Sequence, residues 1–255
     1  FFREYFVFLR GIDSTKEFLF KKVIRPYRKW VLFRAVIKRA AKPVKPWLIV
    51  AFLNVEAVAI YTLAASLVTM LKEFFPTTGS ALLAFEANNS GRLKYIFSRG
   101  IKYSFFYGLA LTALAFFFVP QFVGLFFTKY LPAMPLFFIF LISVPLHGIQ
   151  TLETEILTAF REQKILTARL MVEIGMDFGL FILLVPFIGV LAAGVSAVVP
   201  IIWRVWFLYR QIAKKYPELR PDIKIIFRFD GEDRIIVKRV FAEAKSFWVA
   251  ATGKR

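Results

Sequence analysis

Apolar residues gather along the chain in six long runs, which are separated by shorter segments rich in charged and turn-forming residues. Each run provides the roughly 20 apolar residues that a helix needs to cross a bilayer. The pattern therefore predicts an all-α integral membrane protein built on a bundle of six transmembrane helices. The predicted spans cover residues 30–53, 57–84, 103–127, 133–159, 169–188 and 190–209.

Basic, amphipathic segments flank the six runs. Residues 1–29 combine a helix start near Asp13 with one apolar and one basic face, a pattern typical of a helix lying in the membrane interface. Residues 229–241 repeat the order of acidic, apolar and basic positions found in 12–24. We therefore expect residues 210–255 to form a basic cytoplasmic tail with a second interfacial helix and the start of a further span.

Positive charge alternates between the connecting segments. The basic segments carry Lys21, Lys22, Arg25, Arg28 and Lys29 before the first run, Arg92, Lys94, Arg99 and Lys102 after the second, Arg161, Lys164 and Arg169 after the fourth, and Arg210, Lys214, Lys215 and Arg220 after the sixth. The alternate connections carry only Lys129. Because cytoplasmic loops are enriched in Lys and Arg, this predicts a multi-pass protein of the cell membrane with both ends of the six-span block cytoplasmic.

Composition narrows the class of protein. The 255 residues are 58% hydrophobic with 32 Phe, whereas soluble domains are about 45–50% apolar. The net charge of +18 would indicate nucleic acid in a soluble protein, but here it lies between apolar runs and favours anionic lipid headgroups, so no nucleic-acid partner is expected. The absence of Cys and the single His exclude thiolate chemistry and multi-histidine metal sites, and no cofactor is expected. The chain opens Phe1-Phe2-Arg3, which we interpret as an internal part of a longer protein.

A cationic stripe lies within the first predicted span. It consists of Arg34, Lys38, Lys42 and Lys45. Spacings of four, four and three place these side chains on one helix face. A central Lys or Arg costs about 2.5 to 3.5 kcal/mol in a bilayer, so the stripe should face protein or a water-filled cavity and offer a path for an anion. Alternatively, Pro43 and Pro46 break the helix, the span begins near residue 46, and the stripe is cytoplasmic.

Other charged residues inside the runs are further candidates. Lys72 and Glu73 lie in the second run, where Lys72 could bind an anionic substrate and Glu73 a coupling ion, unless the two neutralise each other. Glu173 and Asp177 are four apart on one face of the fifth run, as paired acids that couple protons or sodium often are. The alternative is that these acids pair with structural cations such as Arg204.

The fourth run carries His147, Glu153 and Glu155. A single histidine is more often a hydrogen-bonded structural residue than a ligand or a switch. The two glutamates are two residues apart and so point to different faces of a helix. They are not expected to act together.

Four short motifs fall at the connections between predicted spans. Residues 54–64 resemble a Gly-Pro-Glu-Ala turn followed by Tyr and small residues, and 126–135 resemble a Phe-Gly-x-x-Tyr-x-x-Ala stretch. Residues 157–164 resemble a Leu-x-Ala-x-Gly-x-x-Lys/Arg loop, and 184–194 an Ile-Pro-x-x-Gly-x-x-Gly-Ala-Ala turn. In this order, the motifs resemble the polysaccharide and oligosaccharide-lipid flippases of the multidrug/oligosaccharidyl-lipid/polysaccharide exporter superfamily. The chain departs from the pattern at Asn54 and at Phe160 and Arg161, where Gly is usual.

The resemblance implies a transporter of two six-span bundles around a central cavity, of which this chain is one, the second being favoured. Its substrate would be a lipid-linked sugar, and its partners the membrane lipids and the other bundle of the full-length chain. No enzymatic step is implied. Two alternatives stay open: a drug or organic-cation antiporter of the same superfamily, and a membrane enzyme acting on lipid-linked sugars. The short outer loops disfavour the enzyme, and the basic first span disfavours the antiporter.

Overall fold

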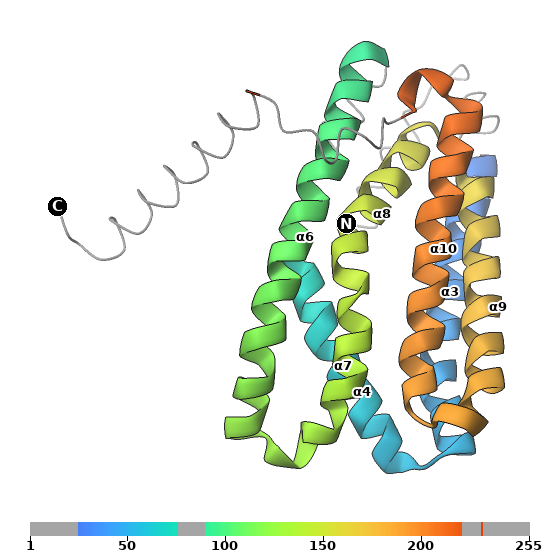
Figure 1. Cartoon of the computed structure of the whole chain (residues 1–255). Helices are drawn as coiled ribbons and strands as arrows, with labels where there is room; N and C mark the ends of the chain where they lie inside the picture. The colour runs from blue at the N-terminus through green and yellow to red at the C-terminus, as the bar shows by residue number, and fades with distance from the viewer. Residues whose placement is uncertain (1–24, 76–89, 221–230, 232–255) are drawn as a thin grey trace, which may run out of the picture.

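The computed structural model describes residues 25–75, 90–220 and Gly231, and this part of the chain is all-helical, with no strand (Figure 1). The long helices are α3 (Arg25–Phe52), α4 (Val55–Glu73), α6 (Ser90–Phe126), α8 (Ser143–Ala159), α9 (Gln163–Ile188) and α10 (Leu191–Lys215). A short α7 (Met134–Leu141) precedes α8, and the 3₁₀ turns η2 (Thr128–Ala133) and η3 (Pro217–Leu219) complete the set.

The helices form a single bundle with α10 near its centre. α9 packs along α10 and against α3, while α6 packs along α8, and α10 also contacts α7 and α8. Figure 1 shows α3, α9 and α10 standing together on one side and α6 with α7 and α8 on the other. α4 runs obliquely behind α7, from the end of α3 towards α6 (Figure 1). The bundle therefore has two sides, which α4 and α10 connect.

Four of the described helices are long and apolar enough to cross a membrane: α4, α6, α9 and α10. The pair α7 and α8 makes a fifth if the bend of 42° between them is taken as a break within one span. The bend has a local cause, because Pro145 has no N–H to donate to the carbonyl of Leu141. The number and composition of these helices fit a multi-pass membrane protein.

The first predicted span is a helix but does not reach this apolar composition. α3 is 28 residues long, yet it carries Arg34, Lys38, Arg39, Lys42 and Lys45. It runs unbroken through Pro43 and Pro46, so the helix break considered as an alternative does not occur. The cations therefore belong to the same rigid helix as the apolar turn that follows them.

The other boundaries shift where charged residues continue a helix. α6 begins at Ser90 rather than 103, because its basic first turns carry on the same helix, and α9 begins at Gln163 rather than 169. α10 extends to Lys215 rather than 209, where two lysines favourably meet the negative end of the helix dipole. α4 ends at Glu73, and residues 76–84 of the predicted span lie outside the described residues.

Several sequence predictions fall wholly or mainly outside the described residues. These are the interfacial helix predicted within 1–29, the repeat of 12–24 in 229–241, and the second interfacial helix of the tail. They stay predictions. Within the described part, the turns near Asn54, Phe127 and Gly189 lie together at one end of the bundle, and the basic ends of α6 and α10 lie at the other (Figure 1).

Candidate functional site

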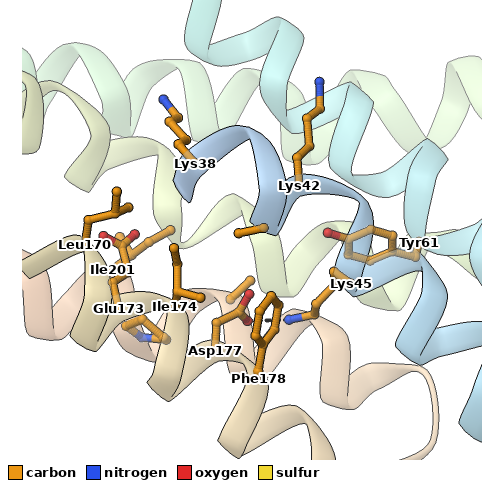
Figure 2. A pocket seen from close by; sticks show the side chains of 13 residues that line it. Lys38, Lys42, Lys45, Tyr61, Leu170, Glu173, Ile174, Asp177, Phe178 and Ile201 are labelled. Carbon is orange, nitrogen blue, oxygen red and sulfur yellow. Dashed lines mark hydrogen bonds and ion pairs between the residues drawn. The ribbon is translucent and has the colours of Figure 1, made fainter. Parts of the chain in front are cut away.

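A cavity of about 340 Å³ lies between α3, α4, α9 and α10. Its lining combines lysines from α3, carboxylates from α9, and aromatic and aliphatic side chains (Figure 2). The lining residues are Lys38, Ala41, Lys42, Lys45, Tyr61, Leu170, Glu173, Ile174, Asp177, Phe178, Ala197, Pro200 and Ile201. Charged groups of both signs thus meet in one space inside the bundle, which is where the cationic stripe was expected to face.

The helical spacing of the stripe brings three of its four members to this cavity. Lys38, Lys42 and Lys45 all line it, which confirms that they share a face of α3. Arg34, one turn before Lys38, is not among the lining residues. It is half-buried and interacts electrostatically with Arg169 at the start of α9. The stripe therefore divides into Arg34 and three cavity lysines.

Lys38 and Lys42 are the accessible cations of the cavity. Both side chains are exposed, and in Figure 2 both point away from the carboxylates of α9. In the described part of the chain neither makes an ion pair with an acidic residue. Two ammonium groups one turn apart, without a counter-ion, create a positive potential that an anion can neutralise.

Lys45 is held in place. It is only 4% exposed, and its Nζ donates a hydrogen bond to Asp177 Oδ1 (Figure 2). It donates a second hydrogen bond of 2.7 Å to Ser196 Oγ on α10. The ammonium also lies 5.3 Å from the centre of the Phe181 ring, within cation–π range. Lys45 thus ties α3 to α9 and α10, and Asp177, a candidate coupling residue, already carries a cation.

Glu173 is paired as well. Its Oε1 accepts a hydrogen bond from Arg204 Nη2 of α10, and its Oε2 lies 3.9 Å from Arg169 Nε, one turn earlier on α9. The alternative given above, that Glu173 pairs with Arg204, is therefore confirmed. Sequence reasoning placed Arg169 in a loop, although its four-residue spacing from Glu173 was a usable signal.

A further carboxylate lies deeper in the bundle. Glu153 of α8 is 1% exposed and interacts electrostatically with Arg169 and Arg204. Within the described part of the chain its Oε2 has no hydrogen-bond partner, and the same holds for Glu173 Oε2 and for the Nε atoms of both arginines. Two glutamates and two arginines from α8, α9 and α10 thus form a mostly buried charged cluster, which extends inward from Glu173 at the wall of the cavity. Nothing in the sequence singled out Glu153 for this cluster.

The remaining predicted site residues do not reach the cavity. Lys72 is half-buried near the end of α4, where it interacts electrostatically with Arg204 and His147, and it does not line the cavity. Glu73 is exposed at the last position of α4. Of the residues predicted to bind substrate or a coupling ion, the structure brings together Lys38, Lys42, Lys45, Glu173 and Asp177.

A separate polar contact closes the basic end of the bundle. Glu162 Oε1, between α8 and α9, accepts hydrogen bonds from Lys215 Nζ at 2.7 Å and from the Tyr216 hydroxyl at 3.1 Å. The Tyr216 ring stacks on Phe160, with ring centres 4.3 Å apart. Burial, followed by the negative charge of Glu162 and this hydrogen bond, raises the pKa of Tyr216 above its usual value.

The cavity can bind an anion through Lys38 and Lys42, while its acids are already matched by Lys45 and Arg204. No group of three or more His, Asp or Glu residues that could hold a metal ion occurs in the part of the chain that the structure describes. Comparison of the chain with protein-family models, curated proteins and solved structures finds no match in any of the three.

Proposed function

We propose that the chain is one six-span bundle of a membrane transporter, a flippase, that moves a lipid-linked sugar with an anionic headgroup across the cell membrane by alternating access. The observation that carries this proposal is the pair of exposed lysines, Lys38 and Lys42, that line the cavity and have no acidic partner among the described residues. A charged side chain costs several kcal/mol if it faces lipid. Charged residues within membrane spans therefore face protein or a water-filled cavity, and they often mark the path of a substrate or an ion.

The lysines of the cavity are spread along the helix axis of α3. The three cavity lysines, from Lys38 to Lys45, cover seven residues of continuous helix, or about 10 Å at 1.5 Å per residue. That is about a third of the roughly 30 Å hydrocarbon core of a bilayer. An anionic group that meets Lys38 can therefore contact Lys42 one turn further along the same helix face.

Besides the five spans that are apolar enough to cross a membrane, the proposed bundle needs one more, and we assign it to α3. Its packing against α4 and α9, and its course alongside α9 and α10, favour a helix that crosses the membrane with its cations turned inward (Figure 1). The six spans are then α3, α4, α6, the bent pair α7 and α8, α9, and α10. The concentration of Lys and Arg at one end of the bundle supports a cytoplasmic position for that end.

No covalent step is required in this proposal, and the protein is not an enzyme. The sugar and its phosphate groups travel through the cavity, and the lipid tail stays in the bilayer. The other six-span bundle of the full-length chain closes the cavity from the opposite side, and rocking of the two bundles exposes it to each face of the membrane in turn. Membrane lipids complete the list of partners.

The acidic lining is the observation that favours the second candidate, an organic-cation antiporter. Asp177 and Glu173 both line the cavity, and organic cations bind to carboxylates. Each of these carboxylates is already paired with a cation of the protein, however, whereas Lys38 and Lys42 are not. The charge available to a ligand is therefore positive, which favours the anionic substrate.

The test is translocation of a fluorescent lipid-pyrophosphate-sugar by the full-length protein in proteoliposomes. Lys38→Ala/Lys42→Ala should lower the rate about tenfold or more, since each charge-assisted contact to an anion contributes about 1.5 to 3 kcal/mol. The matched control is Lys164→Ala/Lys214→Ala, which removes two exposed lysines outside the cavity and should change the rate less than about twofold.

Equal rates for wild type and Lys38→Ala/Lys42→Ala, with both proteins folded, would contradict an anion path through this cavity. A wild-type protein that does not move the lipid-linked sugar but exchanges an organic cation for protons or sodium would establish the antiporter instead. Equal loss in the cavity variant and in the control variant would show that net charge, rather than the cavity, governs transport.

A further inference from the structure

Two acids on neighbouring turns of α9 each hold a cation from a different helix. Asp177 accepts from Lys45 of α3, and Glu173 accepts from Arg204 of α10. Both carboxylates line the same cavity as the accessible Lys38 and Lys42. The cavity wall thus contains two cations that are neutralised internally and two that are not, and the internal anions sit four residues apart on one face.

We propose that Asp177 and Glu173 are resident counter-anions, which an incoming phosphate-bearing headgroup displaces from Lys45 and Arg204. This inference rests on the proposed function and specifies how the same cavity recognises its substrate. Lys38 and Lys42 make the first contact with the headgroup, and Lys45, deeper along the same face of α3, becomes available by exchange of partners.

Exchange of partners keeps Lys45 compensated throughout. Removing one member of a buried ion pair leaves an uncompensated buried charge, which is strongly destabilising. A phosphate that takes the place of Asp177 beside Lys45 leaves no cation bare. The displaced Asp177 carboxylate lines the cavity and its side chain is 26% exposed, so water can solvate it.

The two pairs are not equivalent. In the described part of the chain, Asp177 is the acid that pairs with Lys45. Arg204, by contrast, interacts with both Glu173 and the buried Glu153. Loss of Glu173 therefore leaves Arg204 with an acid nearby, whereas loss of Asp177 leaves Lys45 with none. The exchange should be most sensitive to Asp177.

The two possible roles of Asp177 predict opposite signs in a binding experiment. The probe is inorganic pyrophosphate, titrated calorimetrically into the full-length protein in lipid nanodiscs. If Asp177 competes with the ligand, Asp177→Asn should bind pyrophosphate about tenfold tighter than wild type, towards the lower end of the coupling measured between close charge pairs. Glu173→Gln should tighten binding by a smaller factor. If the acids only hold the bundle together, both variants should bind equally or more weakly, and the proposal is overturned.

Lys45→Met/Asp177→Asn is the matched second variant, because it removes both charges of the pair and leaves no bare lysine. It should lose the tightening gained in Asp177→Asn and bind no better than wild type. Equal affinities for the single and the double variant would overturn the exchange, because Lys45 would then make no contact with the ligand.

Lys38→Ala/Lys42→Ala separates this proposal from the proposed function. If that variant binds pyrophosphate as tightly as wild type does, the anion path itself is wrong, and the exchange is overturned with it. If it binds more weakly while Asp177→Asn binds no more tightly than wild type, only the exchange is wrong. Weaker binding by Lys38→Ala/Lys42→Ala together with tighter binding by Asp177→Asn supports both proposals.

Discussion

The two sides of the bundle are held together by different forces. Where α4, α6, α7 and α8 meet, the interior is apolar: Phe137 and Leu136 are fully buried, and Gly108 and Gly148 let α6 and α8 approach closely. Where α3, α9 and α10 meet, a smaller apolar cluster around Ile49 and Phe181 is joined by ion pairs and a cavity. Lys45 and Glu173 there each take partners from more than one direction.

This difference indicates which side can change shape. Close-packed apolar contacts have few alternative arrangements, because any shift opens voids or creates overlaps. Ion pairs that share partners can rearrange without leaving a charge bare, and Glu173, Arg169, Arg204 and Glu153 form such a group. The side that contains the cavity is therefore also the side whose contacts allow a second state.

Removal of Arg204, whose side chain is 20% exposed, should produce the largest loss of stability. Arg204→Met leaves Glu173 without its hydrogen-bonded partner and takes a cation from the neighbourhood of Glu153. We expect a loss of about 3 to 5 kcal/mol in the free energy of unfolding, measured by detergent-induced unfolding in mixed micelles. The matched control is Lys215→Met, which breaks an exposed ion pair with Glu162 (Lys215 side chain 43% exposed) and should cost at most about 1 kcal/mol.

Similar losses for Arg204→Met and Lys215→Met would mean that water reaches the charged cluster freely. The cluster would then resemble a surface network rather than a buried one. The two sides of the bundle would then not differ by a buried charged cluster.

The apolar side should respond to the addition of a single methyl group. A Cβ at Gly108 would lie 2.6 Å from Pro145 Cα and 3.0 Å from the Val144 carbonyl oxygen, both backbone atoms of the facing helix. Gly108→Ala should therefore destabilise the bundle by about 1 to 3 kcal/mol in the same unfolding assay. On the cavity side, Gly175 of α9 has no neighbour within 4 Å, so Gly175→Ala should stabilise by about 0.5 to 1 kcal/mol. A neutral Gly108→Ala would contradict close packing of α6 on α8.

The sequence predicted where the helices lie better than it predicted how many of them are apolar enough to cross a membrane. Apolar runs define helical segments because apolar length and composition act locally, and each of the six runs does contain a helix. The boundaries moved wherever basic residues extended a helix, as in α6 and α10, because a helix continues through charged residues when their side chains reach water. The bend between α7 and α8 lies at Pro145, a residue type whose position in the sequence favours a hinge or a span end, but the sequence does not give the angle.

Of the candidate site, the sequence could predict the shared faces but not the partners. The spacing of Lys38, Lys42 and Lys45, and that of Glu173 and Asp177, follows from one helical period, and both sets line the cavity. That α3 and α10 both pack against α9, and that Glu153 lies beside Arg204, depends on the packing of distant segments. Arg34, Lys72 and Glu73 were chosen by the same local spacing, but they lie outside the cavity because spacing does not determine which segments pack together.

The smallest effect concerns the contact at the basic end of the bundle, away from both the apolar interior and the cavity. Because the pKa of Tyr216 is raised, the folded state holds the phenolic proton more tightly than the unfolded state does. This contribution to stability is fully present below the ordinary tyrosine pKa of about 10 and is lost as the pH rises through the raised value. Glu162→Gln removes the negative charge and should lower the pKa of Tyr216, but not fully to the ordinary value, because burial is the larger cause. The measurement is the ultraviolet absorbance of tyrosinate during a pH titration, with Tyr216→Phe subtracted to isolate this residue. A Tyr216 that titrates identically with and without the Glu162 charge would show that the contact at this end is open to water, and Phe160 alone would then hold the ring.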